Sequence, residues 1–71
     1  MSDPKVIVDK AMDYLKRGFK LKINPVDKYV YLVAYKIEEG KRTTESLCDF
    51  AKDADLCNKV LDMLVDLGAI P

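Results

Sequence analysis

The chain has 71 residues, of which 49% are hydrophobic and 34% charged, so we expect one globular domain over residues 1–71 rather than a disordered segment. It has no apolar run as long as a membrane span, and its first residues enter a charged amphipathic pattern rather than a signal peptide, which indicates a cytoplasmic protein without membrane contact. Net charge is zero, but residues 1–42 carry ten of the twelve Lys and Arg, which predicts either a basic surface for an anionic partner, two halves that attract one another, or simply solvated faces.

The first predicted element is a helix that begins at Asp3-Pro4 and ends before Gly18. Aspartate caps free backbone amides, and proline fits the first helical turn. The apolar residues of this segment recur at helical spacing and form one stripe, which predicts a helix packed on a core: Ile7, Val8, Ala11, Met12, Tyr14 and Leu15. After this helix, the alternation of apolar and polar residues predicts a short extended segment over residues 19–23.

Residues 24–39 carry conflicting signals. Asn24-Pro25 repeats the pattern of cap and proline, and Gly40 is a typical helix end, so both flanks favour a helix. Residues 29–35 are rich in β-branched and aromatic side chains, which favours a strand. We favour the helix because its apolar stripe is continuous (Val26, Tyr29, Val30, Val33 and Ile37); as a strand, residues 19–37 would form a β-hairpin.

Two further helices are predicted in the carboxy-terminal half. Thr43 or Thr44 caps a short third helix that ends near Ala51, and Asp55 caps a fourth helix over residues 56–67. The expected fold is therefore all-α, with four helices, an extended segment at 19–23 and a helix-turn-helix formed by the last pair. The fourth helix has a broad apolar arc, which predicts a homodimer or hetero-oligomer unless the first two helices cover it.

The carboxy-terminal half also carries a family-like pattern at Gly40, Thr43, Leu47, Ala51 and Leu67-Gly68-Ala69-Ile70. With these residues, segment 37–70 resembles the helix-turn-helix core of winged-helix transcription regulators, especially the small archaeal and viral ones. The resemblance implies DNA binding in transcription or chromatin. The chain departs from that family in lacking a wing after the last helix and in placing acids where the recognition helix normally presents polar or basic groups: Asp53, Asp55 and Asp62.

The basic residues gather elsewhere, and they carry the leading hypothesis of a small DNA-binding protein. Phe19, Tyr31 or Tyr35 can add stacking to their phosphate contacts. The predicted nucleic-acid contacts combine the basic amino-terminal patch with two residues of the fourth helix: Lys16, Arg17, Lys20, Lys22, Lys28, Lys41, Arg42, Asn58 and Lys59.

The alternative is a protein–protein adaptor, such as an accessory subunit of a replication or transcription complex. Its interface would use Tyr31 and Tyr35 together with Met63 and Val65 at the margins of the fourth helix. The chain has no histidine and no Gly-rich phosphate loop, so we expect neither an enzyme, nor a cofactor, nor a small-molecule substrate.

The two cysteines, Cys48 and Cys57, lie on consecutive predicted helices. A closed metal site needs four ligands, and the chain has no histidine and no other cysteine, so no metal is expected. They are either buried thiols or a disulfide between two helices. The scarcity of side-chain amides is typical of thermophile proteins, in which cytosolic disulfides occur.

Overall fold

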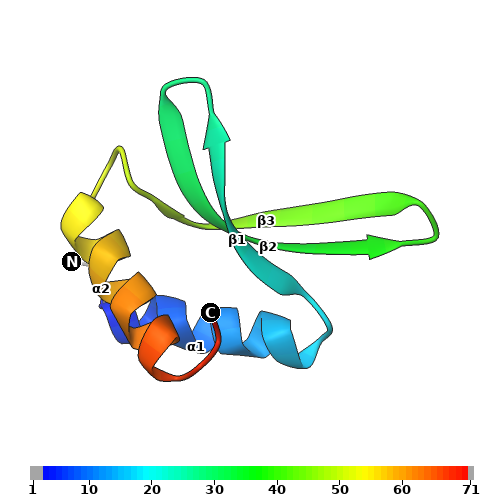
Figure 1. Cartoon of the computed structure of the whole chain (residues 1–71), viewed down its shortest axis with the longest axis horizontal. Helices are drawn as coiled ribbons and strands as arrows, with labels where there is room; N and C mark the ends of the chain where they lie inside the picture. Colours follow the sequence, from blue (N-terminus) through cyan, green and yellow to red (C-terminus); the bar gives the residue numbers. More distant parts are fainter. Residues whose placement is uncertain (1–2, 71) are drawn as a thin grey trace.

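The computed structural model describes residues 3–70, which form two helices and a three-stranded antiparallel sheet (Figure 1). The elements follow the chain as α1 (Pro4–Lys16), β1 (Lys20–Val26), β2 (Tyr29–Glu38), β3 (Lys41–Asp49) and α2 (Ala54–Asp66). The strands lie in the order β1-β2-β3, so each pairs with its neighbour in sequence. The fold is therefore α+β, and the predicted all-α, four-helix fold with a helix-turn-helix is wrong.

The two helices form where the sequence signals are strongest. The Asp3 carboxylate accepts a hydrogen bond from the Lys5 amide at 2.9 Å, and Pro4 is the first helical residue of α1. Gly18 follows α1 with a φ of +91°, a conformation that glycine adopts without steric cost. In α2 the capping residue is Asp53, whose carboxylate accepts from the Leu56 amide at 3.1 Å. The predicted cap, Asp55, lies two residues further on, inside the first turn of α2.

The segment predicted as a second helix is a β-hairpin, the alternative that the sequence left open. Asn24 and Pro25 lie inside β1 rather than at a helix start. Proline has no backbone N–H group. It is tolerated there because β1 is an edge strand, which has a neighbouring strand on one side only. β2 begins at Tyr29 after a turn in which Asp27 has a φ of +54°. The strand propensity of residues 29–37 thus prevails over the cap-like signals at either end.

The predicted third helix, from Thr43 to Ala51, is also wrong, because residues 41–49 form β3. Gly40, read as a helix end, belongs instead to the turn between β2 and β3, where Glu39 and Gly40 have φ values of +51° and +78°. Positive φ at both central residues is typical of the tight turn that joins antiparallel strands. A register shift between Leu32 and Val33 leaves Leu47 as an extra residue in β3.

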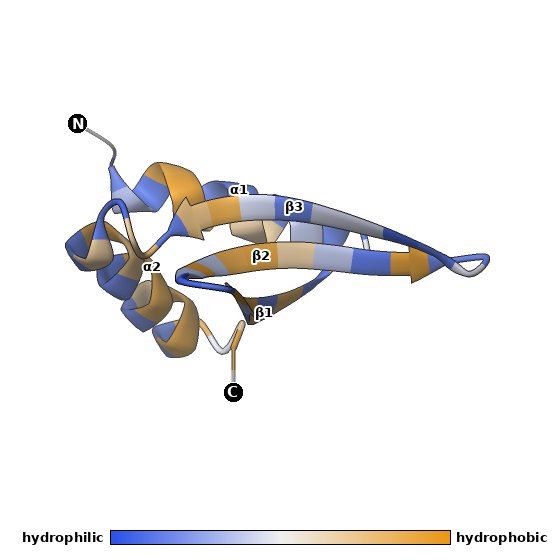
Figure 2. Cartoon of the chain, turned by 90° about the horizontal axis from the view of Figure 1, so that it is seen from above, coloured by the Kyte–Doolittle hydropathy of each residue, from blue (hydrophilic) through white to orange (hydrophobic). Residues whose placement is uncertain are grey.

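The hydrophobic core lies between the two helices and one face of the sheet. Figure 2 shows β2 as largely apolar and β3 as increasingly polar toward the turn at Gly40. The buried cluster draws on both helices and on the inner sides of β2 and β3: Val8, Ala11, Leu32, Cys48, Cys57, Val60 and Leu64.

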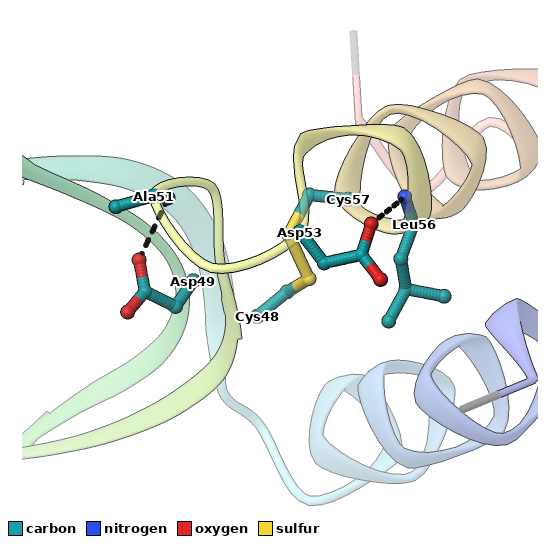
Figure 3. The surroundings of a disulfide bond; sticks show 6 residues. All are labelled: Cys48, Asp49, Ala51, Asp53, Leu56 and Cys57. Atoms are coloured by element: carbon teal, nitrogen blue, oxygen red, sulfur yellow. Dashed lines mark hydrogen bonds between the residues drawn. A yellow bond between two sulfur atoms is a disulfide. The ribbon is translucent and has the colours of Figure 1, made fainter. Parts of the chain in front are cut away.

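A disulfide joins the end of β3 to the first turn of α2. Cys48 and Cys57 are bonded, with their Cα atoms 5.9 Å apart, and both are buried (Figure 3). The Asp49 carboxylate accepts from the Ala51 amide at 2.9 Å and orders the connection between the two elements. Of the two states considered for the cysteines, the structure has the disulfide, which fixes α2 against the sheet.

Candidate nucleic-acid interface

One face of the sheet carries no helix. Side chains alternate along a strand, so Leu32 and Ala34 face the helices while Tyr31, Val33 and Tyr35 point to the opposite side. Among residues 3–70, both helices pack on the Leu32 side (Figure 1). We call the opposite side the open face. The strand register assigns its residues as Lys20, Lys22, Asn24 and Val26 from β1; Tyr29, Tyr31, Val33, Tyr35 and Ile37 from β2; and Arg42, Thr44, Ser46 and Asp49 from β3.

Tyr35 is the centre of a basic cluster on the open face. It pairs across the sheet with Lys20 on β1 and with Thr44 on β3. The Lys22 amine lies 4.9 Å from the centroid of its ring, and the Arg42 guanidinium carbon lies 5.3 Å from it. Both distances are within the range of cation–π attraction. The two strands that flank β2 therefore place two cations at the Tyr35 ring and a third, Lys20, directly opposite Tyr35 in the sheet.

A second aromatic group lies at the other end of β2. The rings of Tyr29 and Tyr31 are 6.4 Å apart and nearly parallel, with 29° between their planes. Tyr29 is 49% exposed, whereas Val33, which lies between the two aromatic groups, is only 3% exposed. Because no element of residues 3–70 covers this face, Val33 is buried by its neighbours on the sheet. The open face thus has an apolar floor with an aromatic group at each end.

A shallow hollow of about 210 Å³ adjoins Tyr35 where β1 begins. It is lined by Gly18, Lys20, Tyr35, Lys36 and Ile37. β1 pairs with β2 only as far as Tyr35, so the edge of β2 beyond that residue is free of β1. The hollow therefore extends the open face around the edge of the sheet, beside two lysines and an aromatic ring.

The structure brings together only part of the predicted nucleic-acid contact set. Lys20, Lys22 and Arg42 share the open face with Tyr31 and Tyr35. Lys28 lies in the turn between β1 and β2, and Lys41 pairs with Glu38 at the other hairpin. Lys16 ends α1, and Arg17 follows it, with its side chain 3.4 Å from the Asp13 carboxylate and over the Tyr14 ring at 4.5 Å. These four residues lie outside the cluster.

The predicted contacts of the last helix lie elsewhere. Asn58 and Lys59 are exposed on α2, which packs on the helix-bearing side of the sheet and is not the second helix of a helix-turn-helix. Met63 packs against the core, and Val65 is 52% exposed on the same helix. The four residues predicted as one protein interface therefore split between two surfaces, with Tyr31 and Tyr35 on the open face and Met63 and Val65 on α2.

The helical interpretation of residues 24–39 concealed several residues of the open face. A helix over residues 24–39 would place Tyr29 in its core-facing stripe and Asn24 at its cap. The signal that identifies them is spacing by two, since Tyr29, Tyr31, Val33, Tyr35 and Ile37 occupy alternate positions in one strand. That spacing was obscured because the intervening residues are also largely apolar, as in strands buried on both sides.

Other kinds of site find no support in the described residues. No group of three or more potential metal ligands occurs in residues 3–70, and both cysteines are used in the disulfide. Within the same range, neither helix combines the length and the apolar character needed to cross a bilayer.

Comparison of the chain with protein-family models, with curated proteins and with solved structures finds no match. The open face itself therefore carries the evidence for function.

Proposed function

We propose that this protein binds nucleic acid through the open face, with Lys20, Lys22 and Arg42 in contact with backbone phosphates. The observation that carries the proposal is the grouping of these three cations beside Tyr35 on a face that neither helix of residues 3–70 covers. Contacts to phosphates supply most of the affinity of nonspecific nucleic-acid binding. The cluster is thus suited to a role in the handling, packaging or transcription of DNA or RNA.

The distribution of the acids supports this choice of surface. Asp53 and Asp55 lie at the amino-terminal end of α2, where they would repel a phosphate backbone. On the open face, Asp49 is opposite Tyr31, at the end far from Tyr35, and its carboxylate is already hydrogen-bonded to the Ala51 amide. A polyanion is therefore attracted to the Tyr35 end of the open face and repelled by α2.

The test is binding of labelled oligonucleotides, measured by fluorescence anisotropy at low salt. Wild-type protein should bind, and its affinity should fall as salt is added. Lys20→Glu combined with Lys22→Glu should abolish binding. The matched control, Lys52→Glu combined with Lys59→Glu, makes the same change of charge away from the open face and should retain it. Absence of binding by the wild type at low salt, or loss of binding in the control alone, would overturn the proposal.

A second candidate function is that of an adaptor in a nucleic-acid-processing complex, and one observation favours it. Val65 and Leu67, at the carboxy-terminal end of α2, are 52% and 59% exposed. Exposed apolar side chains at the end of an amphipathic helix are suited to contact with another protein subunit. This surface is separate from the open face, so replacing Val65 and Leu67 by serine should weaken assembly with a partner or a second copy without changing nucleic-acid affinity. Light scattering of wild type and variant measures the self-association.

A further inference from the structure

The open face carries more aromatic surface than phosphate contacts require. Lysine and arginine alone suffice to hold a phosphate backbone. Here the cations accompany three tyrosines, and two of the cations lie directly beside the Tyr35 ring. Tyr29 and Tyr31 form a second aromatic group. Within residues 3–70, no lysine or arginine makes a cation–π contact with either ring. A ligand that matches this face would carry planar rings as well as negative charge.

The shape of the face does not fit the groove of a duplex. Three strands span about 10 Å between the outer backbones before side chains are added, whereas the major groove is about 12 Å wide and admits a helix or a two-stranded ribbon. The sheet narrows to a two-stranded ribbon at the ends of both hairpins, which project away from the helices (Figure 1). Neither tip concentrates positive charge, because Glu38 and Glu39 lie beside Lys41 at one and Asp27 lies beside Lys28 at the other.

A single strand offers what the open face can bind. Its bases are not enclosed in a double helix, so their flat faces are free to stack on aromatic side chains while cations follow the backbone. Tyr29 and Tyr35 are six residues apart in one strand, and because β2 is curved (Figure 1) their separation is at most about 20 Å. That distance accommodates several nucleotides laid along β2. Val33 and Ser46 lie between the two groups and present no charge to a base.

On this basis, and resting on the proposed function, we propose that the open face binds single-stranded nucleic acid, with bases stacked on Tyr35 and on the Tyr29–Tyr31 pair. Lys20, Lys22 and Arg42 then contact the phosphates on either side of the base at Tyr35. The guanidinium of Arg42 and the amine of Lys22 are on flexible side chains, so a base can take their place against the ring while they move to its phosphates.

The decisive experiment compares three ligands of about 12 nucleotides at low salt: a single strand, the corresponding duplex, and an abasic single strand with the same phosphates. The proposal predicts that the single strand binds at least about tenfold more tightly than either of the others. Equal binding of the abasic strand, or tighter binding of the duplex, would overturn the stacking proposal and leave phosphate binding intact. Failure of all three to bind would overturn the proposed function itself.

The tyrosines provide a direct readout that requires no variant. The chain has four tyrosines and no tryptophan, so its intrinsic fluorescence comes from tyrosine, and three of the four lie on the open face. Stacked bases should quench this emission on addition of the single strand and not of the abasic strand. Unchanged emission on saturation with the single strand would contradict stacking.

Variants of Tyr35 assign the effect to the ring. Tyr35→Phe retains an aromatic face and should bind within about twofold of wild type, whereas Tyr35→Leu should bind at least about fivefold more weakly. The matched control is Tyr14→Leu, which removes a tyrosine of α1 on the helix-bearing side of the sheet and should bind as wild type does. Circular dichroism of each variant verifies that the fold is retained. Equal affinities of the Leu and Phe variants at position 35 would refute the role of the ring.

Discussion

The Lys36 amine donates a hydrogen bond to the backbone carbonyl oxygen of Arg17 at 3.0 Å, and so joins the middle of the sheet to the end of α1. The same amine lies 2.6 Å from the Glu38 carboxylate. A cation at the carboxy-terminal end of a helix satisfies carbonyl groups that have no partner within the helix and interacts favourably with its dipole. Although Lys36 lines the hollow beside Tyr35, its charge is already used within the protein.

We therefore expect Lys36→Met to affect stability and not binding. Loss of the contact at the helix end should lower the free energy of unfolding by about 1 kcal/mol, as measured by urea denaturation. Oligonucleotide affinity should stay unchanged. Lys20→Met, the matched change on the open face, should give the reverse result. Equal weakening of binding by both variants would show that Lys36 also contacts the ligand.

The salt dependence of binding should count the phosphate contacts. Three contacts with a single strand predict a slope of about −2 in a plot of log K against log salt concentration. Replacement of Lys22 by glutamine should make the slope shallower by about 0.7, because one counterion fewer is released. Lys59→Gln, on α2, should leave the slope as it is. A slope near zero in the wild type would exclude the phosphate contacts.

Reduction of the disulfide between Cys48 and Cys57 should destabilise the fold strongly. Cross-linking residues nine apart removes chain entropy from the unfolded state worth about 3 kcal/mol. In a domain of this size that corresponds to a fall in Tm of about 10 to 20 °C. Thermal unfolding with and without a thiol reductant measures it. The variant with both cysteines replaced by alanine should be insensitive to the reductant, and a wild type equally insensitive would contradict the prediction.

The two sides of β2 should differ in their sensitivity to truncation. Leu32 is fully buried between the helices and the sheet, so Leu32→Ala should lower the free energy of unfolding by about 2 to 5 kcal/mol. Ile37 is 64% exposed on the open face, so Ile37→Ala should change the free energy of unfolding by less than about 0.5 kcal/mol. Chemical denaturation of both variants tests the orientation of the strand, and similar costs at the two positions would contradict it.

The turn between β2 and β3 can be improved. Glu39 has a positive φ, which is unfavourable for glutamate, and Gly40 follows it with the same sign. Asn-Gly is the preferred pair in such turns, so Glu39→Asn should raise the free energy of unfolding by roughly 0.5 to 1 kcal/mol. Glu39→Ala, which removes the charge without favouring positive φ, separates the conformational effect from the electrostatic one. A gain of the same size in the alanine variant would assign the effect to charge.

The sequence predicts the ends of this fold better than its middle. Asp3-Pro4 and the amphipathic pattern identify α1, and the apolar residues from Leu56 onward identify α2, because a cap and a helical period agree in each case. In the middle of the chain, the cap-like residues and the strand propensity favour different structures. Gly40 supplies the positive φ that either a helix end or a hairpin turn requires, so glycine alone cannot distinguish them. The apolar run of β2 likewise fits both a helix and a strand that is covered on each side.

The candidate site was predicted in its residue types but not in its geometry. Lys20, Lys22 and Arg42 were each identified as basic contacts, but their meeting around Tyr35 depends on strand pairing between segments that the helical prediction did not pair. Tyr31 and Tyr35 share a face in a strand as they would in a helix, since a spacing of four residues fits both periods. Tyr29 shares a face with Tyr31 and Tyr35 in a strand but not in a helix.

The chain order of the elements has a consequence for folding. Each strand pairs with its neighbour in sequence through a two-residue turn, so both hairpins can form from local contacts, which favours rapid folding. The helices belong to opposite ends of the chain and pack on each other and on the sheet, so the core closes only when the whole chain has assembled. Disulfide formation needs only β3 and the start of α2. Oxidation can therefore fix the carboxy-terminal half before α1 docks, which makes α1 the element whose arrival completes the native state.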